Sequence, residues 1–504
     1  MFLIELGSRL KLVLLGLLVT FLLGCNEPAA DVLRFGLSSA PINLDPRFAT
    51  DAASTRINRL LYQRLVDFDE AYRATPSLAT WQQISPQHYR FTLKTDKLGH
   101  FSNGDALNAT DVKATYESVL DESVASPHRA GFTMIERIEI KDEQTVDFFL
   151  NKSDALFPGR LVVGILPASA LASGQTYSRL PVGSGAFDFM QWSEDGLLEL
   201  KRRRDGQLLS FIEVKNPTVR VLKLLRGELD MVQNDLPTEL VAYLNTDKKD
   251  QVTVSKGRGS NYTYLGFNLA DDDMGNLKLR QAIAYAIDRE AIIHYVMGDG
   301  AALANALLPP DHWAGNSDVG QYQHDAERAR KLLKEAGYDE NNPARIVYKT
   351  SSDPFRIRLA TVIQQQLAEV GVEVDLRSYD WGTFYGDIKA GRFQMYSLSW
   401  VGIKTPDIYR YVFHSEAIPP NGANRGRYED AEVDGLIDAA EATDDLAEQA
   451  TKYRQLQLRL WQQLPYVPLW YEDHVFISRS NISGYQLARD GNYDGLMTVQ
   501  RASD

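Results

Sequence analysis

The stretch of the sequence with the clearest chemical potential is a short loop, WVGIKTPD, at residues 400–407. A strand is expected to end at Trp400, and the loop after it carries Gly402, Lys404 and Asp407. In open α/β sheets ligands bind beyond the carboxyl ends of the strands, so charged side chains and backbone amides here favour solute binding. The alternative is that Trp400 covers the edge of a core and Lys404 is merely solvated.

Motifs for common catalytic and nucleotide-binding sites are missing. The chain has no Gly-x-x-x-x-Gly-Lys phosphate loop, no Gly-x-Ser-x-Gly elbow and no pair of histidines at metal-binding spacing. GDGAAL at 298–303 begins like a dinucleotide-binding fingerprint but lacks the last glycine and follows an expected helix. We therefore predict a protein that is not an enzyme, with no catalytic residues, no metal and no cofactor.

Aromatic side chains could line a ligand cleft, because they bury a large area and several keep a polar group. Each of them is individually more typical of a core residue. The candidates are Tyr62, Tyr264, Trp381, Tyr396, Trp400, Tyr409 and Trp470.

Length and composition indicate a soluble protein of two or three domains. The chain has 504 residues, of which 44% are hydrophobic and 24% charged, and its net charge is −13. Nucleic-acid binding needs clustered lysine and arginine, so this charge argues against a nucleic-acid partner.

The N-terminus has the order of a secretory signal. Arg9 and Lys11 precede an apolar run that is too short for a comfortable membrane span and ends at LLGC. Its cysteine, Cys25, is the sole one in the chain, and the pattern resembles the bacterial lipoprotein signal motif. We predict a signal peptide at 1–24, a lipid on Cys25 and a flexible tether at 25–30. The alternative is an ordinary signal peptide that stops near a cysteine.

Elements before residue 264 include a strand from residue 31, a helix within 89–120 capped by Asn108 or Thr110, and a hairpin at 137–151. From about residue 264 helices and strands alternate, which indicates parallel crossovers in an α/β layer. We expect one helix to start at Asp325, a second at Asp353-Pro354, and a third to cover 381–390. The expected strands are 344–350, 372–379 and 393–400.

Several stretches, in order along the chain, resemble the family 5 extracellular solute-binding proteins, the large binding proteins of peptide-type ABC importers. They include INLDP (42–46), FSNGDALNATDVKATYESV (101–119), LPVGSGAFDFMQW (180–192), YLGFNLA (264–270), LRQAIAYAIDREAII (279–293), AERARKLLKEAGY (326–338) and LPYVPLWYE (464–472).

This resemblance implies an α/β, two-lobed periplasmic-binding-protein-like fold with an extra subdomain inserted in lobe I. The chain would cross between the lobes near Tyr264 and near Ser478, and a bound solute would stabilise the closed form. The implied parts are lobe I at 31–55, 183–263 and 480–504, the inserted subdomain at 56–182, and lobe II at 264–479.

The resemblance also sharpens the interpretation of the loop. In oligopeptide-binding members an aspartate three residues beyond the tryptophan pairs with the α-ammonium of the peptide, whereas this chain has Ile403 there. Asp407 could replace that acid. Otherwise the solute lacks a free amine and carries a negative group near Lys404, since a buried ammonium needs a carboxylate partner.

Other cleft residues follow from the same resemblance. Those members can carry an arginine where this chain has Ser397. Arg425 and Arg427 could lie near Lys404 in the pocket, where they would repel an ammonium, but we favour the alternative that they belong to a surface loop. The remaining implied ligand-binding residues are Ser39, Ala40 and Pro41 on lobe I, and Trp381 and the Trp400, Val401 and Gly402 edge on lobe II.

The function implied is that of an exported, lipid-anchored solute-binding protein in the periplasm or cell envelope. It would capture peptides or peptide-like solutes as a monomer and deliver them to ABC permease subunits with a separate ATPase. Two alternatives remain: a non-peptide, for example anionic, solute on the same fold, or an envelope sensor or chaperone lipoprotein without a dedicated transporter.

Overall fold

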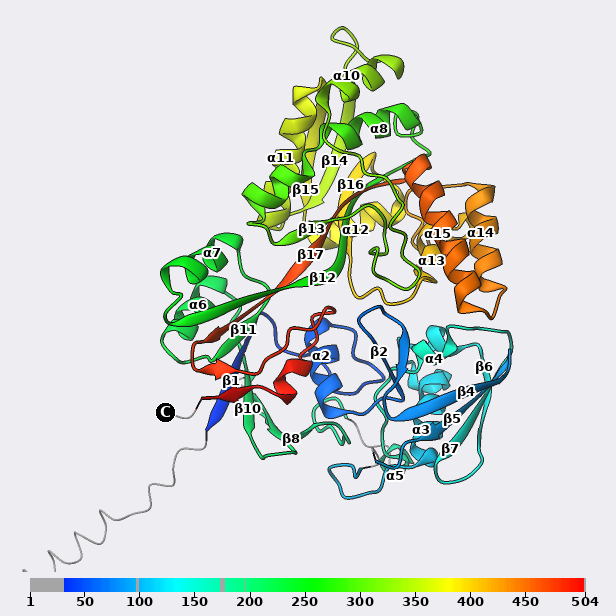
Figure 1. The fold of residues 1–504 in the computed structure, drawn as a ribbon, viewed down its shortest axis with the longest axis vertical. Coiled ribbons are helices and arrows are strands. Elements are labelled where there is room, and N and C mark those ends of the chain that lie inside the picture. The colour runs from blue at the N-terminus through cyan, green and yellow to red at the C-terminus, as the bar shows by residue number, and fades with distance from the viewer. Residues whose placement is uncertain (1–30, 97–98, 173–176, 195, 503–504) are drawn as a thin grey trace, which may run out of the picture.

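The computed structural model describes residues 31–96, 99–172, 177–194 and 196–502, and within them one sheet of eleven strands runs through the molecule (Figure 1). The strand order is β15-β14-β16-β12-β17-β11-β1-β10-β9-β8, with β13 paired to β17. Two long strands occupy its middle, β12 (Val252–Phe267) and β17 (Tyr466–Arg479). The predicted signal peptide and Cys25 lie outside the described residues.

We use the name lobe I for the part of the sheet beyond β17 that contains the first strand of the chain, with its helices. Its elements are β1 (Val32–Leu37), β8 (Phe187–Trp192), β9 (Leu198–Arg202), β10 (Leu208–Glu213), β11 (Met231–Gln233), α2 (Ala52–Leu61), α6 (Pro217–Leu225) and α7 (Thr238–Asp247). The C-terminal segment after β17 packs into the same core through Tyr493, Leu496 and Val499.

The insertion is a separate layer beside lobe I, built on an antiparallel sheet of order β4-β5-β7-β6 (Figure 1). Its elements are β4 (Ala79–Ser85), β5 (His88–Leu93), β6 (Ile135–Ile140), β7 (Thr145–Leu150), α3 (Ala109–Leu120), α4 (Phe157–Arg160) and α5 (Ala168–Ala172), with the small pair β2 (Val66–Phe68) and β3 (Ala74–Pro76). Its core begins at Leu65 and ends at Ile165, whereas Tyr62, Leu166 and Ala170 of α5 pack in lobe I, so α5 lies between the two.

Lobe II is the other end of the sheet with its surrounding helices. Its elements are β13 (Ala301–Leu303), β14 (Ala344–Ser351), β15 (Val372–Tyr379), β16 (Met395–Trp400), α8 (Leu277–Ala286), α9 (Arg289–Ala291), α10 (Ala326–Glu335), α11 (Pro354–Glu369), α12 (Trp381–Ala390), α13 (Ile408–Phe413), α14 (Ala431–Glu441) and α15 (Leu446–Gln463). β14 pairs in parallel with β15 and β16, which confirms the predicted crossovers.

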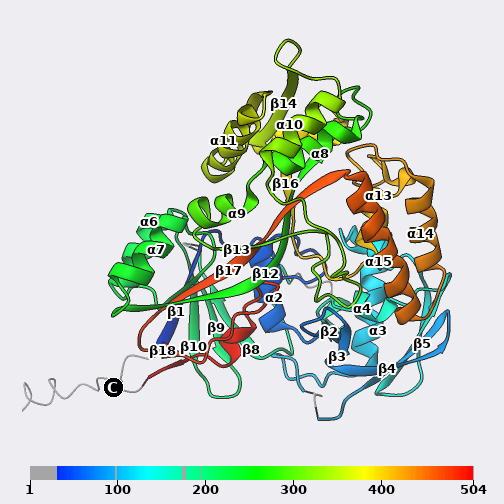
Figure 2. The same cartoon turned by 45° about the horizontal axis from the view of Figure 1, so that its top comes forward.

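β12 and β17 form the antiparallel connection between the lobes (Figure 2). Their register shifts between Gly257 and Asn261, so β12 carries extra residues at this point. A β-bulge bends the strand and interrupts the ladder, which makes this position a natural hinge. Tyr264 already pairs with β16 on the lobe II side, and Ser478 with β11 on the lobe I side.

Local signals in the sequence account for many element boundaries. The side chains of Asn108, Asp325 and Asp353 accept hydrogen bonds from backbone amides in the first turns of α3, α10 and α11, as predicted. Within the described residues, no helix has the length and apolar character that crossing a bilayer would require.

The two glycines of the LPVGSG motif, Gly183 and Gly185, are required for a steric reason that only the folded structure reveals. A Cβ added at Gly183 would lie 1.9 Å from the Leu61 carbonyl oxygen, and one at Gly185 would lie 2.3 Å from that of Leu60. The backbone of the motif therefore passes directly against the end of α2, and Gly185 donates a hydrogen bond to the Leu61 carbonyl at 2.8 Å. Only glycine permits this approach.

Candidate functional site

A cavity of about 230 Å³ lies in lobe II at the carboxyl ends of β14 and β16. Its wall combines hydroxyl groups, apolar side chains, two tryptophans and one charged residue. The lining residues are Thr263, Tyr348, Thr350, Ser351, Arg356, Leu359, Ile363, Trp381, Phe384, Ser397, Leu398, Ser399, Val401, Leu469 and Trp470. A mostly apolar cavity with a few convergent polar groups is typical of a small-molecule site.

Sheet register and helix caps position these side chains. Thr263 on β12 lies directly opposite Ser399 on β16, and their hydroxyl oxygens are 2.7 Å apart. The Asp380 side chain caps α12 at the Thr383 amide, which places Trp381 at the first helical position, above the strand ends. Trp381 stacks on Tyr385 with ring centroids 5.4 Å apart, and 59% of its surface is exposed.

Arg356 is the charged residue of the cavity wall, and it pairs with Glu472 of β17. Its Nη1 donates to Glu472 Oε1 at 2.7 Å, and the Thr263 hydroxyl donates to the same oxygen at 2.9 Å. Burial acts to raise the pKa of Glu472, but Arg356 and these hydrogen bonds outweigh it and hold that pKa below its ordinary value. Glu472 is therefore ionised at neutral pH.

This arrangement can recognise a polar solute of no large net charge. The guanidinium has five N–H groups, and its described hydrogen bonds go to Glu472 alone, so donors remain for a carbonyl or carboxylate oxygen. The Thr263 hydroxyl is committed as a donor to Glu472, so the Ser399 hydroxyl is the donor between the two. The sequence did not single out Arg356 or Glu472; the only signal was an acid following the apolar run VPLWY.

The aromatic residues around Trp400 form a second cluster that contains Arg425. Arg425 donates to the Tyr264 hydroxyl at 3.1 Å and the Tyr385 hydroxyl at 3.2 Å, and lies 4.8 Å from the Trp400 ring centroid. Only 6% of Arg425 is exposed, so its interpretation as part of a surface loop is wrong. Among the described residues no carboxylate pairs with it, and hydroxyl and cation–π contacts stabilise its charge.

Lys404 and Asp407 do not line the cavity, because both take part in ion pairs with other parts of the chain. Lys404 Nζ lies 2.8 Å from Asp490 Oδ2, in the C-terminal segment of lobe I. Asp407 Oδ2 lies 3.0 Å from Nη1 of Arg160, at the end of α4 in the insertion. The first pair therefore connects lobe II to lobe I, and the second connects lobe II to the insertion.

The remaining predicted residues are spread over both lobes. Val401 lines the cavity and is 64% exposed, while the neighbouring Gly402 has a positive φ of 73°. On lobe I the Ala40 amide donates to Glu213 at 3.0 Å, Ser39 is exposed and Pro41 is buried. These three lobe I residues are not part of the cavity wall.

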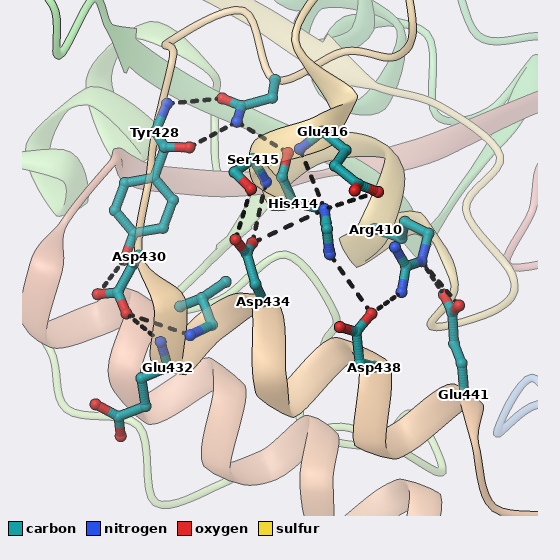
Figure 3. A network of polar contacts seen from close by, with 12 residues as sticks. Arg410, His414, Ser415, Glu416, Tyr428, Asp430, Glu432, Asp434, Asp438 and Glu441 are labelled. Atoms are coloured by element: carbon teal, nitrogen blue, oxygen red, sulfur yellow. Dashed lines mark hydrogen bonds and ion pairs between the residues drawn. The ribbon is translucent and has the colours of Figure 1, made fainter.

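Figure 3 shows the polar contacts that join the helix after the 400–407 loop to α14. The loop leads into α13, where Arg410 Nε donates to both carboxylate oxygens of Glu441 on α14 at 2.8 Å. The hydroxyl of Ser415, just after α13, donates to Asp434 of α14 at 2.6 Å. These contacts hold α13, and with it the end of the loop, against α14. Within the described part of the chain, no three or more His, Cys, Asp or Glu are grouped to hold a metal ion.

Comparison with known proteins places this geometry in context. Residues 73–417 match the model of the bacterial extracellular solute-binding proteins, family 5. The dipeptide-binding protein of Escherichia coli K12 is 27% identical over 94% of this chain and 95% of its own length. Heme-binding protein A of Haemophilus influenzae is 27% identical over 92% of this chain and 91% of its own.

Among solved structures, the substrate-binding protein CtaP of Listeria monocytogenes superimposes with a TM-score of 0.83 at 23% identity. The match covers 94% of this chain and all of that one. This likeness supports the fold.

Proposed function

This chain belongs to the family 5 bacterial extracellular solute-binding proteins of the peptide ABC importer type, and we propose that it captures a peptide or peptide-like solute between its lobes. In this proposal the protein is not an enzyme, and it delivers its solute to permease subunits that work with a separate ATPase. The division into lobe I, an inserted subdomain and lobe II is part of the same proposal, with the packed core of the insertion running from Leu65 to Ile165.

The observation that carries this proposal is the cavity of lobe II, with Arg356 in its wall, paired to Glu472 behind it, and the exposed ring of Trp381 at its edge. A peptide-like solute offers carbonyl oxygens to the Arg356 guanidinium and donors to the hydroxyl-lined wall. Trp381 supplies an exposed aromatic surface for the solute, and the backbone of Val401 and Gly402 offers hydrogen bonds to an extended chain. A relative with a peptide-binding name supports the solute class.

Lobe I supplies the other half of the proposed cleft through Ser39, Ala40 and Pro41, with Ser397 and Trp400 on lobe II. Closure about the bulge between Gly257 and Asn261 brings these surfaces together, and a solute that contacts both lobes shifts the population toward the closed form.

Export and anchoring through Cys25 remain part of the proposal, with the protein held as a monomer in the periplasm or cell envelope. Substituting Cys25→Ser in the full chain is expected to release the protein from the membrane fraction and to abolish labelling with radioactive palmitate. Unchanged membrane association in the variant would contradict the anchor.

A non-peptide solute is the second candidate function, because Ile403 stands where the resemblance implies an acid and a relative carries a heme-binding name. Native mass spectrometry of residues 26–504, compared with the denatured sample, separates the two candidates. A released mass that fragments as a peptide supports the first. A discrete non-peptide mass would overturn it in favour of the second.

A further inference from the structure

Ion pairs and aromatic contacts join lobe II directly to lobe I and the insertion, and two of the ion pairs come from the loop 400–407. They connect residues that are far apart in the sequence and belong to elements on opposite sides of the hinge. Their positions raise the question of what they contribute besides covering the solute.

The pair between Lys404 and Asp490 is partly buried. The Lys404 side chain is 25% exposed and that of Asp490 18%, and the ammonium lies 5.1 Å from the ring centroid of Phe68 in β2. The Lys404 carbonyl accepts a hydrogen bond from His312 Nε2 at 3.1 Å, which fixes its backbone. The Asn492 amide donates to Asp490 at 3.1 Å, so both partners are held in place by their own lobes.

A second ion pair, between Asp407 and Arg160, lies three residues further along the chain from Lys404. Arg160 Nε also donates to Asp154 at 2.6 Å, and the Thr405 hydroxyl donates to Asp407 at 2.5 Å. Burial works against the charge of Arg160, but the two carboxylates outweigh it and raise the pKa of the guanidinium. The Arg160 guanidinium thus bridges Asp154 of the insertion and Asp407 of lobe II.

Neighbouring contacts extend the same interface. Arg489 in the C-terminal segment lies 2.7 Å from Asp311 of lobe II, and the Trp313 amide donates to the Ala71 carbonyl at 3.0 Å. Tyr72 of the insertion stacks on His312 with ring centroids 5.4 Å apart. These contacts form only when lobe II rests on the insertion and lobe I.

We propose that the Lys404–Asp490 and Asp407–Arg160 pairs are a closure clasp, made of positioning residues that favour the closed arrangement in the solute-free protein. None of the four side chains lines the cavity, so they act on the equilibrium between open and closed forms. When only part of the protein is in the closed form that holds the solute, the apparent affinity for the solute falls in proportion to that part. Loss of the clasp therefore weakens solute binding without removing a solute contact. This last consequence alone rests on the proposed function.

Two features make the clasp reversible. The hinge strand β12 has an interrupted ladder at Gly257 to Asn261, so opening requires few backbone hydrogen bonds to break. A partly buried ion pair regains hydration when it opens, which offsets much of its Coulomb attraction. The closed form is therefore favoured by a modest factor, which a solute or a permease can shift.

The test measures lobe separation in the absence of any solute. Spin labels on Ile84→Cys at the insertion and Leu446→Cys at the start of α15 report the distance across the clasp, since both positions are exposed. Residues 26–504 serve as the sample, because they contain every element described and lack Cys25. We expect a mainly short distance in the parent protein. Lys404→Ala and Asp407→Ala should each raise the open-to-closed ratio about three- to tenfold, the range for a partly buried ion pair.

Controls separate a clasp from a merely structural role. The exchange Lys404→Asp with Asp490→Lys should restore most of the closed population, and Lys278→Ala, which breaks an ion pair within lobe II, should leave the distances unchanged. A mainly open parent protein, unchanged distances in the single variants, or an exchange that stays as open as they are would each overturn the proposal. Since no solute is present, these outcomes are independent of the proposed solute class.

Discussion

The buried imidazole of His312 leads us to predict that the folded protein loses stability in mild acid, because folding opposes protonation of this side chain. The residue is 3% exposed between Tyr72 and Trp313, at the contact of lobe II with the insertion. Its Nδ1 accepts a hydrogen bond from the Ala314 amide at 3.0 Å, and its Nε2 donates to the Lys404 carbonyl at 3.1 Å. Both nitrogens are thus used by the neutral imidazole, and a proton on Nδ1 would face an N–H group.

The magnitude follows from the shift of the imidazole pKa. Burial lowers the pKa of His312 to about 4; the Lys404 carbonyl and the charges of Asp311 and Asp69 act the other way, and Arg489 adds to the lowering. Between about pH 6.5 and pH 4 the unfolded chain binds a proton that the folded chain does not. The contribution of the neutral His312 to the free energy of unfolding is therefore complete above pH 6.5. It declines by about 1.4 kcal/mol per pH unit as the pH falls toward 4.

The assay compares the parent protein with His312→Gln, which cannot titrate. Urea unfolding followed by tryptophan fluorescence should show the parent losing about 1.4 kcal/mol more unfolding free energy than the variant between pH 7.5 and pH 5.5. His324→Gln, at an exposed histidine with 41% of its side chain accessible, is the matched control and should behave like the parent. Burial also lowers the pKa of His474, so part of the acid loss remains in every variant.

A direct readout is the titration of ¹³C-labelled histidine by NMR, with the His312 signal assigned through the variant. Equal acid losses in the parent and His312→Gln, or a His312 signal that titrates near pH 6.5, would refute the reasoning. Either result would mean that water reaches the imidazole, so that Tyr72 and Trp313 do not enclose it in solution.

Three further predictions test the cavity and the fold. Trp381→Ala should weaken binding of the solute identified by mass spectrometry about tenfold in calorimetry, with little change in Tm, because the ring is mostly exposed; Tyr295→Ala, an exposed aromatic outside the cavity, should do neither. Glu472→Gln should lower the free energy of unfolding by about 2 kcal/mol, since Arg356 loses its charged partner. Glu373→Gln, at an exposed ion pair, is the control and should cost under about 1 kcal/mol in the same urea titration. Equal losses in the two variants would contradict the burial of the Arg356–Glu472 pair. Gly183→Ala should destabilise the chain by about 3 kcal/mol because its Cβ meets the Leu61 carbonyl; Gly131→Ala, with open space around its Cβ, is the control, and a Gly183→Ala protein as stable as this control would show that α2 shifts freely.

Local signals predicted much of the secondary structure of lobe II. Asp325 and Asp353 cap α10 and α11, and β15 and α12 have the predicted bounds. Capping depends on a side chain and amides two or three residues away, so it is legible in the sequence. The predicted parallel crossovers are also present, because helices of this length between strands permit few other connections.

The sequence by itself determined the family, the alternation of helices and strands in lobe II and the importance of the 400–407 loop. Only the tertiary structure decided what the charges of that loop contact. Lys404 and Asp407 pair with Asp490 and Arg160, while the charged side chain of the cavity wall is Arg356, which pairs with Glu472. A cap has its partner in the same turn of chain, but an ion pair forms wherever folding brings two charges together. Its partner therefore depends on how the lobes pack, which local sequence patterns do not encode.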